Sequence, residues 1–208
     1  MRRLVLLLTV MAAALVLASG VALAVNRVGT NGHDVLKGTD GKDNLIGLGG
    51  QDDLFGKGGG SDNLVGGEGK DNVLAGDERR LGRGDKNLVG GPGNDVVLTG
   101  KGSDNAVGGD GNDFLFECCL REFSKDTLSG GSGNDVIDVS HKPAVQDVVT
   151  CGDGFDRVLS DRADRVAPDC EKVVVVHGSV EDVFRQFDEF IESVPESFFR
   201  GLPPNPFR

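Results

Sequence analysis

The sequence predicts an all-β protein, a solenoid of stacked short repeats closed by a C-terminal strand cap and a short amphipathic helix. A nine-residue pattern rich in glycine and aspartate recurs from Gly29 to Asp138, and such self-similarity at a short fixed period is typical of solenoids. Each copy ends in a short aliphatic run, which suits a strand. After Ala144 the glycine pattern fades, and valine-rich runs up to Val176 lead into one helical stripe.

The first 24 residues are expected to be a secretory signal peptide that is removed from the mature protein. Met1-Arg2-Arg3 is a basic start, an apolar run extends from Leu4 to Ala18, and Ala22-Leu23-Ala24 fits the small-x-small cleavage pattern. A membrane anchor is the alternative, but a spanning helix needs about 20 apolar residues, and Ser19-Gly20 interrupts this run. We therefore expect a secreted protein without a permanent membrane span.

The predicted organisation has four parts. They are the signal peptide at 1–24, the repeats at 25–139, a degenerate repeat and C-terminal cap at 140–176, and the amphipathic helix and tail at 177–208. The formal net charge of the chain is −11, and loss of Arg2 and Arg3 with the signal peptide moves it to −13 (−11 − 2). We expect no nucleic-acid partner, because phosphate binding needs clustered Lys and Arg. Dense carboxylates either repel one another or hold cations.

All four cysteines lie in the predicted mature region, at Cys118, Cys119, Cys151 and Cys170. An exported protein can oxidise them, and four cysteines allow three full pairings. A bridge between the neighbours Cys118 and Cys119 would be strained, so we expect a structural disulfide between Cys151 and Cys170. Whether Cys118 and Cys119 are paired stays open.

Four copies fit the pattern G-G-x-G-x-D-x-U-x in full, where U is a large aliphatic residue; they are 66–74, 90–98, 108–116 and 130–138. Weaker copies continue the pattern in steps of about nine residues, and Lys86 takes the aspartate position once. The other aspartate positions are Asp34, Asp43, Asp52, Asp62, Asp71, Asp95, Asp104, Asp113 and Asp135. Insertions at 77–81 and 117–127 interrupt the series, and Gly152–Val158 is a degenerate copy.

These repeats resemble the RTX family of calcium-binding nonapeptide proteins, from Gly29 to about Asp138 and more loosely to Val176. The resemblance implies a parallel β-roll solenoid with two nonapeptides per turn and calcium between stacked loops. Partners on the same side then lie about eighteen residues apart. The pairs are Asp34 with Asp52, Asp43 with Asp62, Asp52 with Asp71, and Asp95 with Asp113. An N-terminal signal is unlike the uncleaved C-terminal signal usual in this family, so the resemblance extends to the repeat chemistry and not to a toxin or protease identity.

The residue types explain why such repeats would bind calcium. Glycines at the first, second and fourth positions permit positive φ angles and a tight turn whose carbonyls converge. Strands in a sheet lie about 4.8 Å apart, so stacked aspartates would repel by roughly 3 kcal/mol per pair at an effective dielectric near 20. A divalent cation turns this repulsion into attraction, and a six- to eight-fold oxygen cage suits Ca²⁺ better than Mg²⁺.

We therefore predict that the nine aspartates hold Ca²⁺, and that the ammonium of Lys86 weakens or empties the site opposite Asp104. Two alternatives are a solenoid turn capped by aspartate without metal and a disordered linker. Each suits a single Gly-Asp turn, but neither accounts for periodic glycine, aspartate and aliphatic positions together.

The U positions form an aliphatic ladder that should be the core. They are Leu36, Leu45, Leu54, Leu64, Val73, Leu88, Val97, Ala106, Leu115 and Ile137. The ninth positions, such as Ile46 and Phe116, are apolar too, so either both rows pack together or another segment covers that face.

The C-terminal segment reads as a helix. Ser179 is the expected N-cap, and Pro195 stops the helix. Phe184, Phe187, Ile191 and Val194 form one apolar stripe. We expect this stripe to pack on the roll rather than to bind a partner.

No catalytic motif is evident, since H-E-x-x-H and G-x-S-x-G do not occur and the three histidines stand singly. The sequence therefore favours a non-enzymatic, secreted protein in which calcium acts as a folding cofactor. A calcium-dependent adhesion or matrix protein with a cell-surface or polysaccharide partner is the alternative, and a small extracellular enzyme is the weaker one.

Overall fold

The structure is a computed structural model, and it describes residues 24–58, 60–76, 86–117, 124–140 and 144–204. The predicted signal peptide lies outside the described residues apart from Ala24, as do Cys118 and Cys119. No helix of the described ranges is long and apolar enough to cross a membrane.

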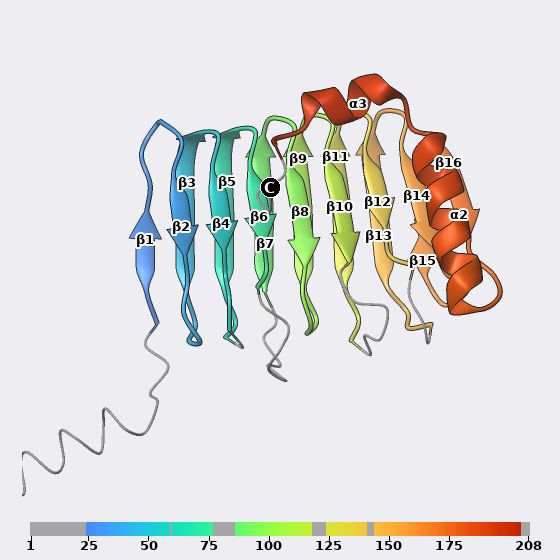
Figure 1. Ribbon diagram of the computed structural model, residues 1–208, viewed down its shortest axis with the longest axis horizontal. Helices are drawn as coiled ribbons and strands as arrows, with labels where there is room; N and C mark the ends of the chain where they lie inside the picture. The colour runs from blue at the N-terminus through green and yellow to red at the C-terminus, as the bar shows by residue number, and fades with distance from the viewer. Residues whose placement is uncertain (1–23, 59, 77–85, 118–123, 141–143, 205–208) are drawn as a thin grey trace, which may run out of the picture.

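Two parallel sheets face each other and form a roll (Figure 1). Within the described ranges each sheet has eight strands, and the chain alternates between the two sheets. The odd-numbered sheet contains β1 (Asn26–Val28), β3 (Asn44–Gly50), β5 (Asn63–Gly69), β7 (Asn87–Pro92), β9 (Asn105–Asp110), β11 (Thr127–Ser132), β13 (Val148–Asp153) and β15 (Arg165–Val166). The even-numbered sheet contains β2 (Val35–Lys37), β4 (Asp53–Phe55), β6 (Asn72–Leu74), β8 (Val96–Thr99), β10 (Phe114–Glu117), β12 (Val136–Asp138), β14 (Arg157–Ser160) and β16 (Lys172–Val175).

The strand register stacks equivalent repeat positions on one another. Leu45 lies beside Leu64 in the odd-numbered sheet, and Val97 lies beside Leu115 in the even-numbered sheet. Because alternate side chains of a strand point to opposite faces, every U residue enters the space between the sheets. All ten predicted U residues are buried there, so the predicted aliphatic core and the parallel β-roll are both confirmed.

The ninth-position residues point away from this core. Ile46 and Phe116 are half-buried, whereas Leu74 is only 4% exposed. The Nδ2 of Asn72 donates a hydrogen bond to the carbonyl of Pro204 (3.1 Å), which brings the C-terminal segment over β6. The ninth-position residues were expected either to pack with the U residues or to be covered by another segment. The second alternative is correct for part of the even-numbered sheet.

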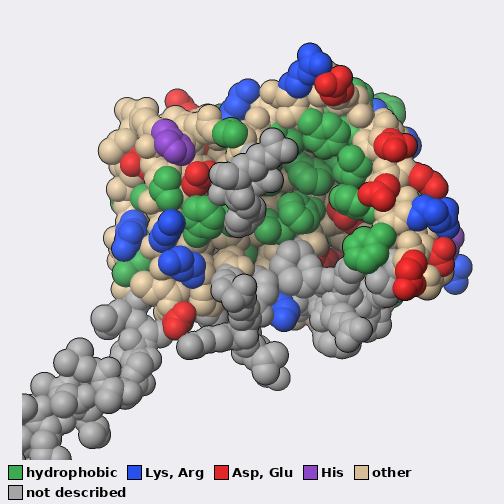
Figure 2. Space-filling view, in the orientation of Figure 1, with side chains coloured by type: hydrophobic (Ala, Val, Ile, Leu, Met, Phe, Trp, Pro, Cys, Tyr) green, Lys and Arg blue, Asp and Glu red, His purple; other side chains and the backbone are tan. Residues whose placement is uncertain are grey.

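Two helices cover the C-terminal half of the same sheet, α2 (Val180–Glu192) and α3 (Glu196–Gly201). They form a second apolar cluster with the outer side chains of β10, β12 and β14, to which Phe114, Val136 and Leu159 contribute. Figure 2 shows hydrophobic side chains gathered on the same face of the molecule, between the charged outer surfaces of the two helices. The prediction that the helix packs on the roll is confirmed.

The helix begins as predicted, but its packed face is shifted. Ser179 and Asp182 form a reciprocal capping box, in which Asp182 Oδ2 accepts from the Ser179 N–H (2.8 Å). Phe187, Ile191 and Val194 join the apolar cluster. The prediction for Phe184 was wrong, because this residue is 54% exposed. Phe190 takes its place at 3% exposure, since contact with the sheet is made further along the helix.

Candidate metal centres

The aspartates of the repeat form two columns, one along each edge where the chain passes between the sheets. The first column joins odd-numbered to even-numbered strands, along the upper edge in Figure 1. It contains Asp34, Asp52, Asp71, Asp95, Asp113, Asp135 and Asp156. The second column lies at the opposite edge and contains Asp43, Asp62, Lys86, Asp104, Asp126, Asp147 and Asp164. The nine predicted aspartates are thus divided between two edges.

One hydrogen bond recurs along each column. The backbone N–H of each aspartate donates to Oδ1 of the aspartate one turn further on, at 2.7–2.9 Å throughout the first column. Asp43 and Asp62 are joined in the same way in the second column (2.8 Å). All four pairings predicted from the eighteen-residue spacing are therefore present. The two pairings that cross insertions, Asp71 with Asp95 and Asp113 with Asp135, are present as well.

The turns place backbone carbonyls in the interval between neighbouring aspartates. Gly91 and Gly93 have φ angles of 122° and 146°, which favour glycine. Their carbonyl oxygens point to Gly109 and Gly111 in the following turn. They lie so close that a Cβ atom at either position would collide with them. The carbonyl of Gly108 points the opposite way and would lie 2.6 Å from a Cβ atom at Gly90. Carbonyls from two successive turns therefore face the same interval.

The second carboxylate oxygen of the inner aspartates of the first column, from Asp52 to Asp135, faces this interval too. A Cβ atom at Gly90 would collide with Asp95 Oδ2, beside the Gly108 carbonyl. Asp95 is fully buried, and its Oδ2 has no hydrogen-bond partner among the described residues. The same holds for Asp52, Asp71, Asp113, Asp135 and Asp156 in the first column, and for Asp62 and Asp126, at 2% and 1% exposure, in the second. Such orphaned acceptors are costly in a folded protein unless something binds them.

Burial makes these carboxyls hard to ionise without a counter-charge. It raises the pKa of Asp95 and Asp113 to about 8, although the N–H of the preceding aspartate lowers each pKa and neighbouring carboxylates raise it again. The pKa of Asp135 is raised to about 7 and that of Asp71 to about 6, again mainly by burial. The columns are therefore strained electrostatically wherever several aspartates are ionised together.

This donor set fits Ca²⁺. Carboxylate and carbonyl oxygens are hard donors, and their irregular arrangement suits the flexible coordination of Ca²⁺ better than the strict octahedron of Mg²⁺. No group of three or more acidic, histidine or cysteine side chains converges as a metal cage in the described ranges. Any cation in these intervals would therefore need backbone carbonyls as well as the paired carboxylates.

Lys86 occupies its place in the second column as predicted. It is 4% exposed, and its Nζ donates to the carbonyl of Lys101 (3.1 Å). Its backbone N–H donates to Asp104 Oδ1 (2.9 Å). The ammonium charge also lowers the pKa of Asp62, which burial raises to about 6. A built-in cation thus stands beside the carboxylate of the preceding turn.

Sequence reasoning missed four members of the columns. Asp156 was recognised only as part of a degenerate copy, and Asp126, Asp147 and Asp164 were not assigned at all. Their backbone hydrogen bonds continue the columns, with Asp104 donating to Asp126 (2.9 Å) and Asp126 to Asp147 (2.8 Å). The signal that could have found them is an aspartate two residues before a buried aliphatic residue, as in Asp126-Thr127-Leu128.

The fold and the two aspartate columns define the class of protein. It is a parallel β-roll whose turns carry stacked, paired carboxylates. A comparison with protein families matches the RTX calcium-binding nonapeptide repeat in four copies, at residues 28–60, 58–77, 82–116 and 124–139. The chain therefore belongs to the family of RTX calcium-binding nonapeptide-repeat proteins. No curated protein and no solved structure matched the chain.

Proposed function

We propose that this chain is an exported, non-enzymatic protein whose β-roll folds when Ca²⁺ is held between successive turns of the two aspartate columns. The observation that carries this proposal is the row of buried aspartates with an unpartnered Oδ2. The proposed ligands are the nine aspartates predicted from the sequence, together with Asp126, Asp147, Asp156 and Asp164. Membership of a calcium-binding repeat family supports this assignment.

Folding would depend on the ion for a simple electrostatic reason. Stacked carboxylates at strand spacing repel by roughly 3 kcal/mol per pair, whereas a whole domain has a net stability of about 5–15 kcal/mol. Several uncompensated pairs would therefore unfold the roll. Asp95 and Asp113, with the carbonyls of the turns between them, would hold a cation that removes this cost, and any ligand bound only by the folded state adds to stability.

Export is supported by the basic start and apolar run at the N-terminus and by the typically extracellular location of RTX repeat proteins. A chain whose folding requires calcium stays unfolded where calcium is scarce and folds where calcium is abundant. The disulfide between Cys151 and Cys170 is compatible with an oxidising compartment.

A calcium titration of the chain without residues 1–24 tests the proposal. We expect the β-sheet signal in far-ultraviolet circular dichroism to rise with free Ca²⁺ and to be lost in excess EDTA. Mg²⁺ at the same concentrations should not replace Ca²⁺. A chain that is fully folded in EDTA, with no metal by mass spectrometry, would contradict the proposal.

A further inference from the structure

The turns of the two columns differ in regularity. Strand pairing identifies the residue that stands at the first position of the repeat in each turn. In the first column this residue always precedes the aspartate by five, as Gly90 precedes Asp95 (95 − 90). In the second column the separation ranges from four at Ser160 to eleven at Ala75 (164 − 160 and 86 − 75). All four full copies of the repeat have their aspartate in the first column, at Asp71, Asp95, Asp113 and Asp135.

Glycine at the first position keeps the intervals of the first column open. A Cβ atom at Gly108 would lie 2.3 Å from Asp113 Oδ2 and 2.6 Å from the carbonyl oxygen of Gly130 in the next turn. The φ angle of Gly108 is not in the left-handed region, so the backbone itself would accept another residue. The space between the oxygens is therefore what requires glycine. The same two contacts recur at Gly47, Gly66, Gly90 and Gly130.

The second column has side chains at the equivalent position. Strand pairing stacks Thr99 on Glu117, and Ala75 precedes Thr99 by one turn. After Gly38 and Gly56, the first-position residues of this column are Ala75, Thr99, Glu117, Val139 and Ser160. Ala75, Thr99 and Val139 are all 0% exposed. Their side chains therefore occupy volume inside the roll that the glycines of the first column leave open.

Thr99 shows how such a side chain changes an interval. Burial raises the pKa of Asp126 to about 8, the Asp104 N–H lowers it, the charges of neighbouring aspartates raise it, and the side chain of Thr99 lowers it. Thr99 therefore lies beside the Asp126 carboxyl. Asp104 Oδ2 accepts from the Gly100 N–H of its own turn (3.0 Å), whereas Asp95 Oδ2 has no hydrogen-bond partner among the described residues. This interval has less room and fewer available oxygens for an ion.

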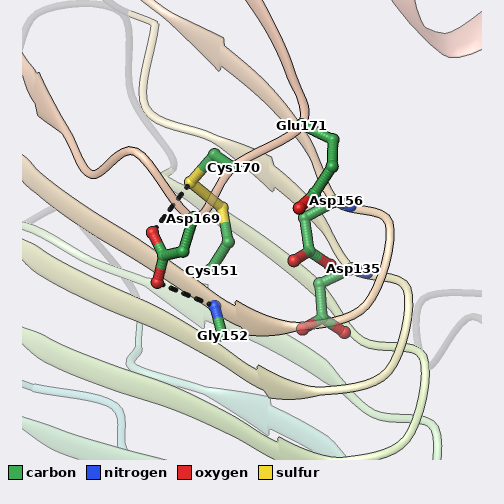
Figure 3. Close-up of a disulfide and its surroundings, with 7 residues drawn as sticks. All are labelled: Asp135, Cys151, Gly152, Asp156, Asp169, Cys170 and Glu171. Atoms are coloured by element: carbon green, nitrogen blue, oxygen red, sulfur yellow. Dashed lines mark hydrogen bonds between the residues drawn. A yellow bond between two sulfur atoms is a disulfide. The ribbon is translucent and has the colours of Figure 1, made fainter.

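The open series of the first column has definite ends. At its C-terminal end Cys151 takes the first position and is bonded to Cys170, as predicted and as Figure 3 shows. Its carbonyl oxygen still faces the preceding interval, 2.8 Å from a Cβ atom at Gly130. At the N-terminal end Asp34 Oδ2 accepts from the Thr30 N–H (2.6 Å). The intervals that combine a first-position glycine with an unpartnered Oδ2 thus begin at Gly47, Gly66, Gly90, Gly108 and Gly130.

We propose that the two columns are unequal, with the tight calcium sites in these intervals of the first column and weaker sites in the second. The residue at the first position decides the class, because glycine leaves room for an ion and a side chain takes it. The inference rests on the proposed function, since it divides the same ligands into two classes. Its consequence is that scarce Ca²⁺ fixes one edge of the roll, while the edge that contains the insertions needs more.

The substitution Gly108→Ala tests the tight class in the chain without residues 1–24. Equilibrium dialysis at stepwise increasing free Ca²⁺ counts the ions bound at each concentration. We expect one ion fewer at low free Ca²⁺, because the added methyl group fills one interval. Gly49→Ala is the matched control, since it lies in a turn of the same column but its Cβ atom would have no neighbour nearer than the Glu68 carbonyl at 3.7 Å. It should leave the count unchanged.

Thr99→Gly tests the second column in the opposite direction. Removing the side chain should add one Ca²⁺ to those bound at low free concentration, a gain that a merely destabilised variant does not produce. Thr99→Val keeps the volume and should show no gain. The inference is overturned if Gly108→Ala retains every tight ion, if Thr99→Gly gains none, or if Thr99→Val loses an ion, because the hydroxyl would then be a ligand. Failure of the proposed function differs, since the unaltered protein would then bind no Ca²⁺.

Discussion

A single aspartate of a column serves two neighbouring intervals. Oδ1 of Asp113 accepts from the Asp95 N–H (2.9 Å), while Oδ2 lies beside Gly108 and the carbonyl of Gly130, which belongs to the next turn. The hydrogen bond to Oδ1 needs only an acceptor, which the oxygen of an amide side chain also supplies. Oδ2, in contrast, has no hydrogen-bond partner among the described residues. Hydrogen bonding and charge can therefore be separated experimentally.

We predict that Asp113→Asn weakens calcium binding while leaving the hydrogen bond from the Asp95 N–H in place. The variant keeps the oxygen that accepts from Asp95 but removes a carboxylate shared by two intervals, so up to two ions should be lost. At 100 times the dissociation constant each lost ion would remove about 2.7 kcal/mol of stability. Calorimetric titration counts the bound ions, and Tm at saturating Ca²⁺ measures the loss of stability.

Asp110→Asn is the control for this substitution. Asp110 occupies the third position of the same turn, and its side chain is exposed. Both variants lose one negative charge from the same six residues, so non-specific attraction of Ca²⁺ changes equally. Equal ion loss in the two variants would show that net charge, rather than the column, binds the metal.

At the scale of elements, one face of α2 packs on the roll and another face is exposed. Phe190 is 3% exposed and belongs to the apolar cluster on the even-numbered sheet, whereas Phe184 in the same helix is 54% exposed. We predict that Phe190→Ala lowers the free energy of unfolding by about 3 kcal/mol. Phe184→Ala should change it by less than about 0.5 kcal/mol. Urea unfolding in saturating Ca²⁺ compares the two, and similar losses would contradict the packing of α2.

The repeat elements were predictable because each copy carries its own core residue. Leu45, Leu64 and Leu88 could be placed inward from the period alone, and their burial follows from strand alternation. Asp126 and Asp147 could not be found by counting nine, because insertions of different length precede them. Strand pairing restores their register, as Thr127 beside Asn105 and Val148 beside Thr127 show.

Tertiary contacts also decided which helical residues are buried. A helical period places Phe184 and Phe187 on one stripe, but it does not say where along its length the helix meets the sheet. In the same way, the position of Glu171 beside Asp156 depends on the pairing of β14 with β16. This pairing does not follow from the nine-residue pattern, so it could be found only from the fold.

At the scale of the whole molecule, the buried carboxyls predict an unusual pH dependence. Burial raises the pKa of Asp95, Asp113 and Asp126 to about 8, while aspartate in an unfolded chain ionises near pH 4. Between about pH 4 and pH 8 the metal-free folded state therefore binds more protons than the unfolded state. Its stability should be greatest at the acid end and fall as pH rises, by about 1.4 kcal/mol per pH unit for each such carboxyl.

Calcium should reverse this trend, because its ligands must be deprotonated. In EDTA the folded fraction, measured by circular dichroism, should be smaller at pH 8 than at pH 5.5, whereas in Ca²⁺ the Tm should rise over the same interval. A metal-free protein whose folded fraction rises with pH would contradict the burial of protonated aspartates in the columns.

Since every inner aspartate borders two intervals, ions in one column would not be independent of one another. Filling one interval orients a carboxylate that the next interval also uses, which makes each binding event favour its neighbour, as in other one-dimensional repeat arrays. The roll would then respond to calcium as an abrupt threshold rather than a gradual dose response. The disulfide-bonded terminus, where the final turn is already held, is the natural place for such ordering to start.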